Sequence, residues 1–386
     1  IKDGFPNKTT YPVASLSLLD YDLDGKLDLF QGHWFKTNKK GKTLIPDRLF
    51  KGDGLKFVDV SYLLEYEHKY IKKIKKFPHA TPTFGSSTCD IDQNGYPDIL
   101  TSNSSGYSNK LWVNLFDFKH NDRLFKEYGK ESGFANDQVG KFQRLGGGKS
   151  FYGICFDYNN DGIMDVVSGE LTHPYDQESR DKSSILTGKE LSPSIKFIRS
   201  EFLLDYGNKN YSYSNKRAVT LDYNNDGRID ILMDNSGFPP NSRLILFEQE
   251  TNHAYTDIAE NIGINILNPS GTIKLDLNSD GLVDFISGQT NIRNSSIPTR
   301  LYVFENITKR HQRKSIRFFL EGDNANSNGI GAMIILKTNK NIYRQWVEYS
   351  YGAQSSQNEA GIHFGIGNEL LDYVEVRWPI SLKNKH

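Results

Sequence analysis

Short runs of strand-forming residues, separated by polar turns, recur along the chain. Residues 13–19 and 26–30 show the pattern, because apolar side chains alternate there with small or polar ones on both sides of an acidic, glycine-containing turn. Alternation with a period of two residues is typical of half-buried β-strands. The chain also holds 23 Phe and 21 Tyr but only 3 Met, a balance that favours strands over helices. The pattern therefore predicts an all-β fold.

The acidic turn occurs five times, each time in the form D-x-[DN]-x-[DN]-G-x-x-D. The copies begin at Asp20, Asp90, Asp157, Asp222 and Asp276. Successive copies are thus 70, 67, 65 and 54 residues apart, a length that suits one four-stranded unit with its loops. Residues 47–61 and 242–260 contain the third and fourth strands of two such units. The sequence predicts a β-propeller with five recognisable blade repeats.

The repeated turn carries the groups that a calcium site requires. Ca²⁺ binds about six to eight oxygen atoms, and alternate side chains of a tight turn can point at one ion. Positions one, three, five and nine offer side-chain oxygens, position seven offers its carbonyl, and glycine at position six permits a positive φ. We expect about five Ca²⁺ ions. The expected ligands are Asp20, Asp22, Asp24, the Lys26 carbonyl and Asp28; Asp90, Asp92, Asn94, the Tyr96 carbonyl and Asp98; Asp157, Asn159, Asp161, the Ile163 carbonyl and Asp165; Asp222, Asn224, Asp226, the Arg228 carbonyl and Asp230; and Asp276, Asn278, Asp280, the Leu282 carbonyl and Asp284.

Two other interpretations of the turn are weaker. An EF-hand needs a helix on each side and a glutamate at position twelve, whereas strand-forming residues flank these turns. Position twelve is occupied by Gln31, Thr101, Ser168, Met233 and Ser287. Acidic glycine turns can also form metal-free hairpins, but several carboxylates gathered five times over call for a cation each time. We interpret the ions as structural.

The sequence around these turns resembles the FG-GAP/VCBS repeat. In that repeat a calcium loop is followed by an "RLF" strand, a glycine turn and a Phe-Asp-Val stretch, and residues 47–61 match this order closely. The resemblance covers residues 11–310 and departs from the pattern at 171–215, which lack the glycine turn. It implies a β-propeller like the head of integrin α-subunits, with five blades or as many as seven, because relatives often close with seven.

Residues 311–386 contain no acidic turn of this form. Four stretches resemble the ASPIC/UnbV domain, which follows such repeats in cartilage acidic protein and in many bacterial secreted proteins. They are residues 328–332, 352–357, 363–367 and 376–379. The sequence departs from the family at Ile366, where leucine is usual. Apolar runs with glycine at the turns predict a small, sandwich-like β domain here.

Charge and cysteine content exclude several classes of protein. Lys plus Arg and Asp plus Glu are equal at 47 each, which argues against a nucleic-acid partner. No apolar run reaches the roughly 18 residues of a membrane-spanning helix. Cys89 and Cys155 precede their turns by one and two residues, so we expect their side chains to alternate and form no disulfide. The family resemblance implies a secreted, periplasmic or cell-surface location.

The strand ends opposite the acidic turns are the expected binding face. Candidate catalytic residues there are His33, Glu170 and His173, since Glu170 and His173 could act as acid and base, while His33 and Trp34 could hold a polar ligand. No nucleophile with a paired base can be assigned, which favours a binding protein over an enzyme. We expect an extracellular calcium-binding propeller that recognises a protein or carbohydrate partner. A secreted lyase, cyclase or hydrolase and a structural subunit of an extracellular assembly are alternatives, and the sequence leaves the oligomeric state open.

Overall fold

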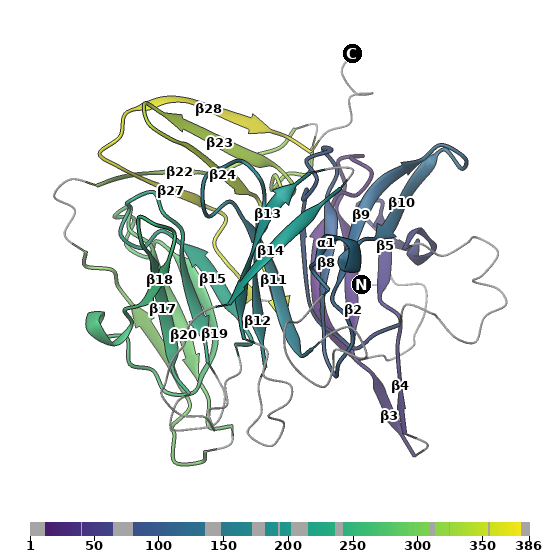
Figure 1. Ribbon diagram of the computed structural model, residues 1–386, viewed down its shortest axis with the longest axis horizontal. Coiled ribbons are helices and arrows are strands. Elements are labelled where there is room, and N and C mark those ends of the chain that lie inside the picture. Colours follow the sequence, from purple (N-terminus) through teal and green to yellow (C-terminus); the bar gives the residue numbers. More distant parts are fainter. Residues whose placement is uncertain are drawn as a thin grey trace.

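The structure is a computed structural model of an all-β protein, which confirms the predicted class (Figure 1). It describes residues 12–39, 41–64, 80–135, 148–171, 182–191, 194–201, 215–235, 242–292, 294–308, 313–323, 325–353 and 356–379. Helix within these ranges is limited to α1 (Gly129–Ser132) and two 3₁₀ turns, η1 (Ser61–Leu63) and η4 (Glu260–Ile262). No helix in the described ranges is long and apolar enough to cross a membrane.

Five antiparallel sheets follow one another along the first 304 residues, each built from consecutive strands. The first has the order β1-β2-β5-β6, and the second continues with β7-β8-β9-β10. Their bounds are β1 Val13–Leu19, β2 Asp28–His33, β5 Arg48–Gly52, β6 Phe57–Asp59, β7 Thr83–Cys89, β8 Asp98–Asn103, β9 Lys110–Asp117 and β10 Asp122–Glu127. A hairpin of β3 (Lys36–Asn38) and β4 (Gly41–Thr43) extends from the first sheet.

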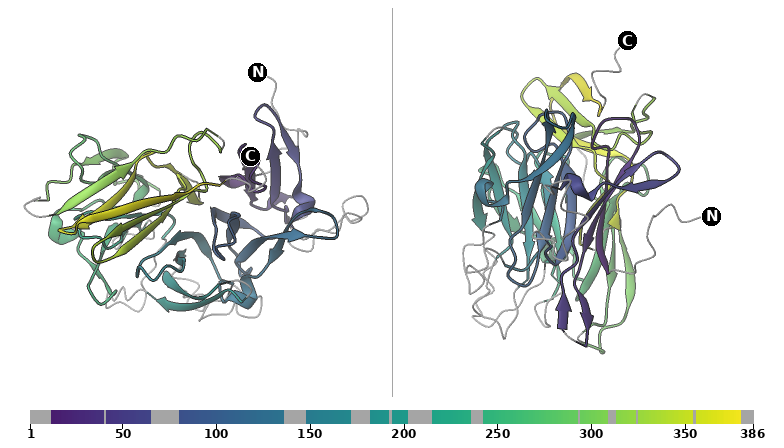
Figure 2. Two further views of the ribbon diagram at one scale, coloured as in Figure 1. Left: turned by 90° about the horizontal axis from the view of Figure 1, so that it is seen from above. Right: turned by 90° about the vertical axis from the view of Figure 1, so that its right-hand side faces the viewer.

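The third and fourth sheets repeat this order, and the fifth has three strands. Their bounds are β11 Ser150–Phe156, β12 Asp165–Glu170, β13 Ser184–Glu190, β14 Lys196–Glu201, β15 Ala218–Leu221, β16 Asp230–Asp234, β17 Leu244–Gln249, β18 Tyr255–Asp257, β19 Pro269–Leu275, β20 Asp284–Gln289 and β21 Arg300–Phe304. The sheets succeed one another around an arc when viewed from above (Figure 2). Their first strands face inward, where β7 packs between β1 and β11.

The hydrophobic core is divided into layers between neighbouring sheets. Phe30 of the first sheet packs with Trp112 and Phe125 of the second, and all three side chains are fully buried. Similar layers lie between the second and third, the third and fourth, and the fourth and fifth sheets. Burial of a large apolar side chain contributes about 1.5–3 kcal/mol, so these layers hold the sheets face to face.

Residues 313–379 form a smaller β unit above the sheets (Figure 1). Its strands are β22 Lys314–Phe318, β23 Met333–Thr338, β24 Ile342–Trp346, β25 Ser350–Ala353, β26 Ser356–Gln357, β27 Ile362–Gly367 and β28 Leu371–Arg377. The pair β22-β27 and the sheet β24-β23-β28 enclose one apolar cluster, as a small sandwich would. The hairpin β25-β26 leaves this sandwich and β25 pairs with β7, so the C-terminal unit is joined to the inner edge of the second sheet.

The structure contradicts the expectation for the two cysteines, because Cys89 on β7 and Cys155 on β11 form a disulfide. The alternation of side chains along a strand was a correct premise. However, the face that one sheet turns toward the next is opposite to the face that the next sheet turns back. Two cysteines that differ by one position before their turns therefore meet between neighbouring sheets, with their Cα atoms 6.5 Å apart.

Candidate metal centres

Each acidic turn connects the first and second strands of its sheet, and all five have the same backbone conformation. Positions four and six have positive φ in every copy. Position four is Leu23, Gln93, Asn160, Asn225 and Ser279, with φ between 56° and 58°. Position six is Gly25, Gly95, Gly162, Gly227 and Gly281, with φ between 80° and 90°. This conformation favours glycine at position six, as predicted, and folds the turn back on itself.

The first aspartate of each turn accepts hydrogen bonds from the turn's own backbone. In the first turn the Asp24 N–H donates to Asp20 Oδ1 at 3.0 Å and the Gly25 N–H donates to Asp20 Oδ2 at 2.9 Å. Asp90, Asp222 and Asp276 accept the same pair of bonds. In the third turn the Gly162 N–H donates to Asp157 Oδ2 at 3.1 Å. These bonds hold the position-one carboxylate over the centre of the turn.

The last aspartate fastens the turn to its sheet. Asp28 accepts the N–H of Tyr21 within the turn at 2.9 Å and the N–H of Gly52 on β5 at 2.8 Å. Asp98, Asp165, Asp230 and Asp284 repeat both bonds with their own neighbours. Since a carboxylate has about four lone-pair positions, these oxygens retain capacity for a metal ion.

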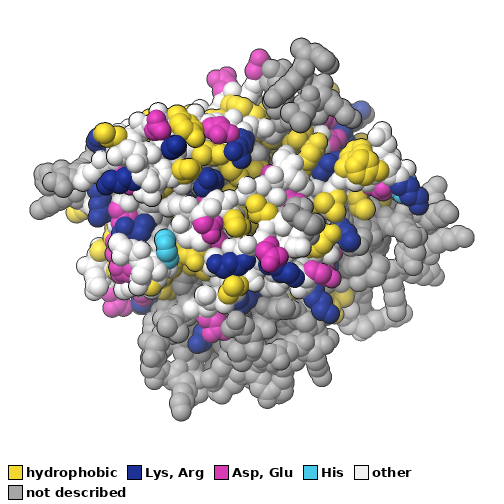
Figure 3. Space-filling view, turned by 45° about the horizontal axis from the view of Figure 1, so that its top comes forward, with side chains coloured by type: hydrophobic (Ala, Val, Ile, Leu, Met, Phe, Trp, Pro, Cys, Tyr) yellow, Lys and Arg dark blue, Asp and Glu magenta, His cyan; other side chains and the backbone are white. Residues whose placement is uncertain are grey.

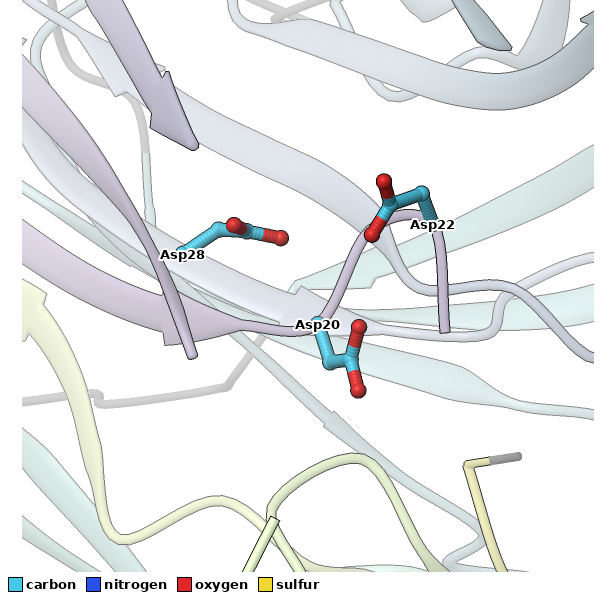
Figure 4. Close-up of side chains that lie close together, drawn as sticks. All are labelled: Asp20, Asp22 and Asp28. Carbon is cyan, nitrogen blue, oxygen red and sulfur yellow. The ribbon is translucent and has the colours of Figure 1, made fainter. Parts of the chain in front are cut away.

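Carboxylate oxygens converge most closely in the first two turns. One oxygen from each of Asp20, Asp22 and Asp28 lies within 4.8 Å of the others, and these three side chains surround one small space (Figure 4). Asp90, Asp92 and Asp98 form an equivalent group. Asparagine replaces aspartate at position three in the other turns, so they bring fewer carboxylates together. The structure thus brings together the predicted ligands of each of these two turns.

Burial makes these carboxylates poor anions without a partner. Desolvation raises the pKa of Asp20 to about 7 and that of Asp28 to about 8, with smaller contributions from neighbouring aspartates. It likewise raises the pKa of Asp90 and Asp222 to about 7, of Asp165 to about 8 and of Asp157 to about 6. A bound cation would offset this cost, because opposite charge favours the ionised form.

Two buried carboxylate oxygens also lack a hydrogen-bond donor, namely Asp22 Oδ1 and Asp157 Oδ1. Leaving such an atom without a partner is unfavourable by about 1–3 kcal/mol or more. A hard divalent cation prefers oxygen ligands of this kind. The residues of the turns therefore fit Ca²⁺.

Basic side chains lie beside four of the turns, and the sequence analysis missed most of them. Lys51 pairs with Asp22 and with Asp24 at 3.0 Å, and Arg228 pairs with Asp226 at 2.5 Å. Arg344 reaches Asp157 at 3.3 Å and Arg317 pairs with Asp276, although both arginines belong to the C-terminal unit. No sequence signal could have found these arginines, because they are more than 40 residues from the turns they reach.

The candidate catalytic residues are not arranged as a site in the part of the chain that the structure describes. His33 and Glu170 end the second strands of the first and third sheets, as expected, but both are buried. The Glu170 carboxylate accepts hydrogen bonds from Ser150 and Ser168, both at 2.8 Å. Burial lowers the pKa of His33 to about 4. His173 lies outside the described residues.

Comparison with known proteins gives one family and one solved structure. The family described as ASPIC and UnbV matches residues 322–386. No curated protein matches the chain. The biofilm matrix protein Bap1 of V. cholerae has a similar structure, with a TM-score of 0.39 and 10% identity over 94% of this chain. The chain spans 54% of the length of Bap1.

Proposed function

We propose that this protein is an extracytoplasmic, calcium-stabilised β-propeller of the FG-GAP/VCBS type, in which the five sheets are blades and the ions are structural. The observation that carries the proposal is the identical geometry of the five acidic turns. Each has the same two positive-φ positions and the same hydrogen bond from its position-six glycine to the first aspartate. A fold repeats such a demanding turn when the turn has a common task, and hard oxygen ligands around one point suit Ca²⁺.

In each turn the side chains at positions one, three, five and nine and the carbonyl at position seven would hold the ion. When bound, Ca²⁺ supplies positive charge to carboxylates that are buried and mutually repulsive. The chain's own contribution is to fix the ligands. The N–H at position seven donates to the side chain at position five in all five turns, at 2.8–3.0 Å. The backbone therefore orients the carboxylates before the ion arrives.

A count of bound metal tests this proposal. Protein stripped with EGTA and then dialysed against Ca²⁺ is expected to hold about five ions by elemental analysis. Replacing Asp28 by Ala should remove one ion, because Asp28 is a ligand of the first turn. Replacing Asp59 by Ala is the matched control, since this aspartate on β6 pairs with Arg48 and should leave the count unchanged. Protein that binds no Ca²⁺ would refute the proposal.

The Cys89–Cys155 disulfide supports the extracytoplasmic location, because disulfides persist mainly in oxidising compartments. The surface also fits a protein that does not bind nucleic acid. Basic and acidic side chains are interspersed on the face that carries the C-terminal unit, with no field of a single sign (Figure 3). A basic stripe, which nucleic-acid binding requires, is not seen on that face.

We place the recognition of a protein or carbohydrate partner at the strand ends opposite the acidic turns. Half-buried Trp34 stacks on Phe84 of the neighbouring sheet, with ring centroids 4.1 Å apart, and the stack continues to Phe151. Lys42 of the β3-β4 hairpin lies 4.1 Å from the ring centroid of Phe35. A rigid aromatic group with a nearby cation is typical of interface hot spots. The enzyme alternative is not favoured, because His33 and Glu170 are buried.

Replacing Trp34 by Ala tests this placement. The protein should bind a member of an array of immobilised oligosaccharides or purified extracellular proteins, and the variant should bind it at least about tenfold more weakly, as loss of a hot-spot aromatic does. Trp378→Ala, on the C-terminal unit, is the matched control and should bind normally. Equal binding by the Trp34 variant, or loss of binding in the Trp378 variant, would place the interface elsewhere.

A further inference from the structure

The C-terminal unit lies directly on the acidic turns of the third, fourth and fifth sheets. Its contact with the fourth turn is the closest. The Gly367 N–H donates to the Asn225 carbonyl at 2.9 Å, and Arg313 donates to the Asn224 carbonyl at 3.1 Å. Both carbonyls belong to the turn itself, so the contact depends on the conformation of the turn.

The fifth and third turns are held by polar side chains of the same unit. Ser315 on β22 donates from Oγ to the Gly281 carbonyl at 2.7 Å, and Arg317 pairs with Asp276. The Asp276 N–H donates to Glu359 at 3.1 Å. In the third turn, Arg344 on β24 pairs with Asp157 at 3.3 Å. Three neighbouring turns are therefore the platform on which residues 313–379 rest.

The platform leaves almost no room for change at the contact. A Cβ added at Gly365 on β27 would collide with the Asp222 carboxylate and lie 2.6 Å from Asn225 Cα. A Cβ at Gly227 would lie 2.5 Å from the Tyr343 hydroxyl. Glycine at position six thus serves two purposes in the fourth turn, since it permits the positive φ and lets β24 approach.

The two arginines bind the aspartates from outside the turn. Arg344 contacts Oδ2 of Asp157, the oxygen that also accepts the Gly162 N–H, while Oδ1 of Asp157 has no donor. Arg317 contacts Oδ2 of Asp276, which accepts the Gly281 N–H in the same way. An outer partner on one carboxylate oxygen orients the other toward a metal, and such partners change metal affinity by about 10–100-fold.

The first turn differs in the source of its nearby charge. Lys51, which pairs with Asp22 and Asp24, comes from β5 of the same sheet and not from the C-terminal unit. The C-terminal unit reaches this turn through Leu27, an apolar residue at position eight that packs on the cluster of the unit. This contact does not involve a ligand side chain, so the first turn provides a matched reference.

We infer that Ca²⁺ in the third, fourth and fifth turns and the docking of the C-terminal unit are coupled, so that each strengthens the other. The inference rests on the proposed calcium binding. An ion that orders a turn also orders the carbonyls and carboxylates to which Ser315, Arg317 and Arg344 bind. By linkage, the docked unit must raise the Ca²⁺ affinity of those turns by the same factor, typically about 5- to 150-fold. The first turn titrates independently.

Hydrogen exchange measured by mass spectrometry, with Ca²⁺ and with EGTA, tests the coupling. Exchange in β22, β24 and β27 should be slowed at least about fivefold by Ca²⁺. The variant Asp280→Ala in the fifth turn should lose much of this protection in saturating Ca²⁺. Asp24→Ala removes the ligand at the same position of the first turn and should leave these three strands protected. Unchanged exchange in β8 shows that each variant is folded.

The reciprocal effect is measured by calcium titration calorimetry. The double variant Arg317→Ala/Arg344→Ala should shift a subset of the sites to about fivefold weaker affinity or more, while Arg377→Ala, at an exposed arginine of β28, should change nothing. Tighter binding in the double variant would show that the arginines compete with Ca²⁺ and would overturn the inference. Ca²⁺ that protects the turns but not β22, β24 and β27 would also overturn it. Absence of any Ca²⁺ binding would instead refute the proposed function.

Discussion

Removal of calcium is expected to lower the melting temperature of the protein by roughly 10–30 °C. A ligand at a hundredfold excess over its Kd stabilises the folded state by about 2.7 kcal/mol per site. Several sites acting together would supply on the order of 10 kcal/mol, and each kcal/mol shifts the melting temperature of a domain this large by about 2 °C or more. Thermal unfolding followed by circular dichroism or calorimetry, in EGTA and in Ca²⁺, measures the effect.

The physical reason is the burial of the carboxylates that each turn brings together. Asp20 and Asp28 are fully buried and Asp22 adds a third carboxylate nearby, so the metal-free turn holds like charges in a poorly solvated place. Lys51 offsets part of this charge in the first turn. Magnesium provides a control, because it demands a smaller, octahedral shell and should stabilise the protein less. Equal melting in EGTA and Ca²⁺ would contradict the expected result.

The same measurement should depend on pH in a defined direction. Burial raises the pKa of Asp20 and Asp90 to about 7 and that of Asp165 to about 8, above the usual value of 3.8. A raised folded-state pKa favours the protonated form, so it stabilises the fold below about pH 4, and this contribution is lost as the pH rises through 7 to 8. The metal-free protein should therefore lose stability between pH 5 and pH 8. Ca²⁺ binds the ionised form, so the difference in melting temperature between Ca²⁺ and EGTA should widen over this interval.

Loss of the disulfide is expected to destabilise the protein by about 4 kcal/mol. Cys89 and Cys155 are 66 residues apart in the sequence, and closing a loop of that length reduces the entropy of the unfolded chain by about this amount. The double variant Cys89→Ser/Cys155→Ser should unfold at a lower denaturant concentration than the native protein, both in saturating Ca²⁺. Guanidinium unfolding followed by fluorescence gives the difference.

Two controls separate the crosslink from the packing of the cysteines. Treatment of the native protein with a reducing agent should reproduce most of the loss, while the double variant should not respond to it. Cys89 is fully buried in the layer between the second and third sheets, so the serine side chains add a packing cost that the reduced native protein lacks. A native protein whose unfolding is insensitive to the reducing agent would show that the crosslink contributes nothing.

The sequence alone determined the features that lie within one repeat. The spacing of Asp20, Asp22 and Asp28 was sufficient to place their carboxylates around one point, because a nine-residue turn has few ways to fold. Gly25 indicated the positive φ at position six in the same way. Alternating apolar residues on both sides of each turn indicated the strands. All of these are local properties, in which neighbours in the sequence are neighbours in space.

Tertiary structure decided what lies between repeats and between the two parts of the chain. The Cys89–Cys155 disulfide depends on which faces of two sheets meet, and the burial of Glu170 depends on how the third sheet packs with its neighbours. Arg344 reaches Asp157 only because β24 rests on the third turn. Such contacts join residues 66 to 187 positions apart, so no periodicity or motif in the sequence could encode them; they follow from how complete sheets pack on one another.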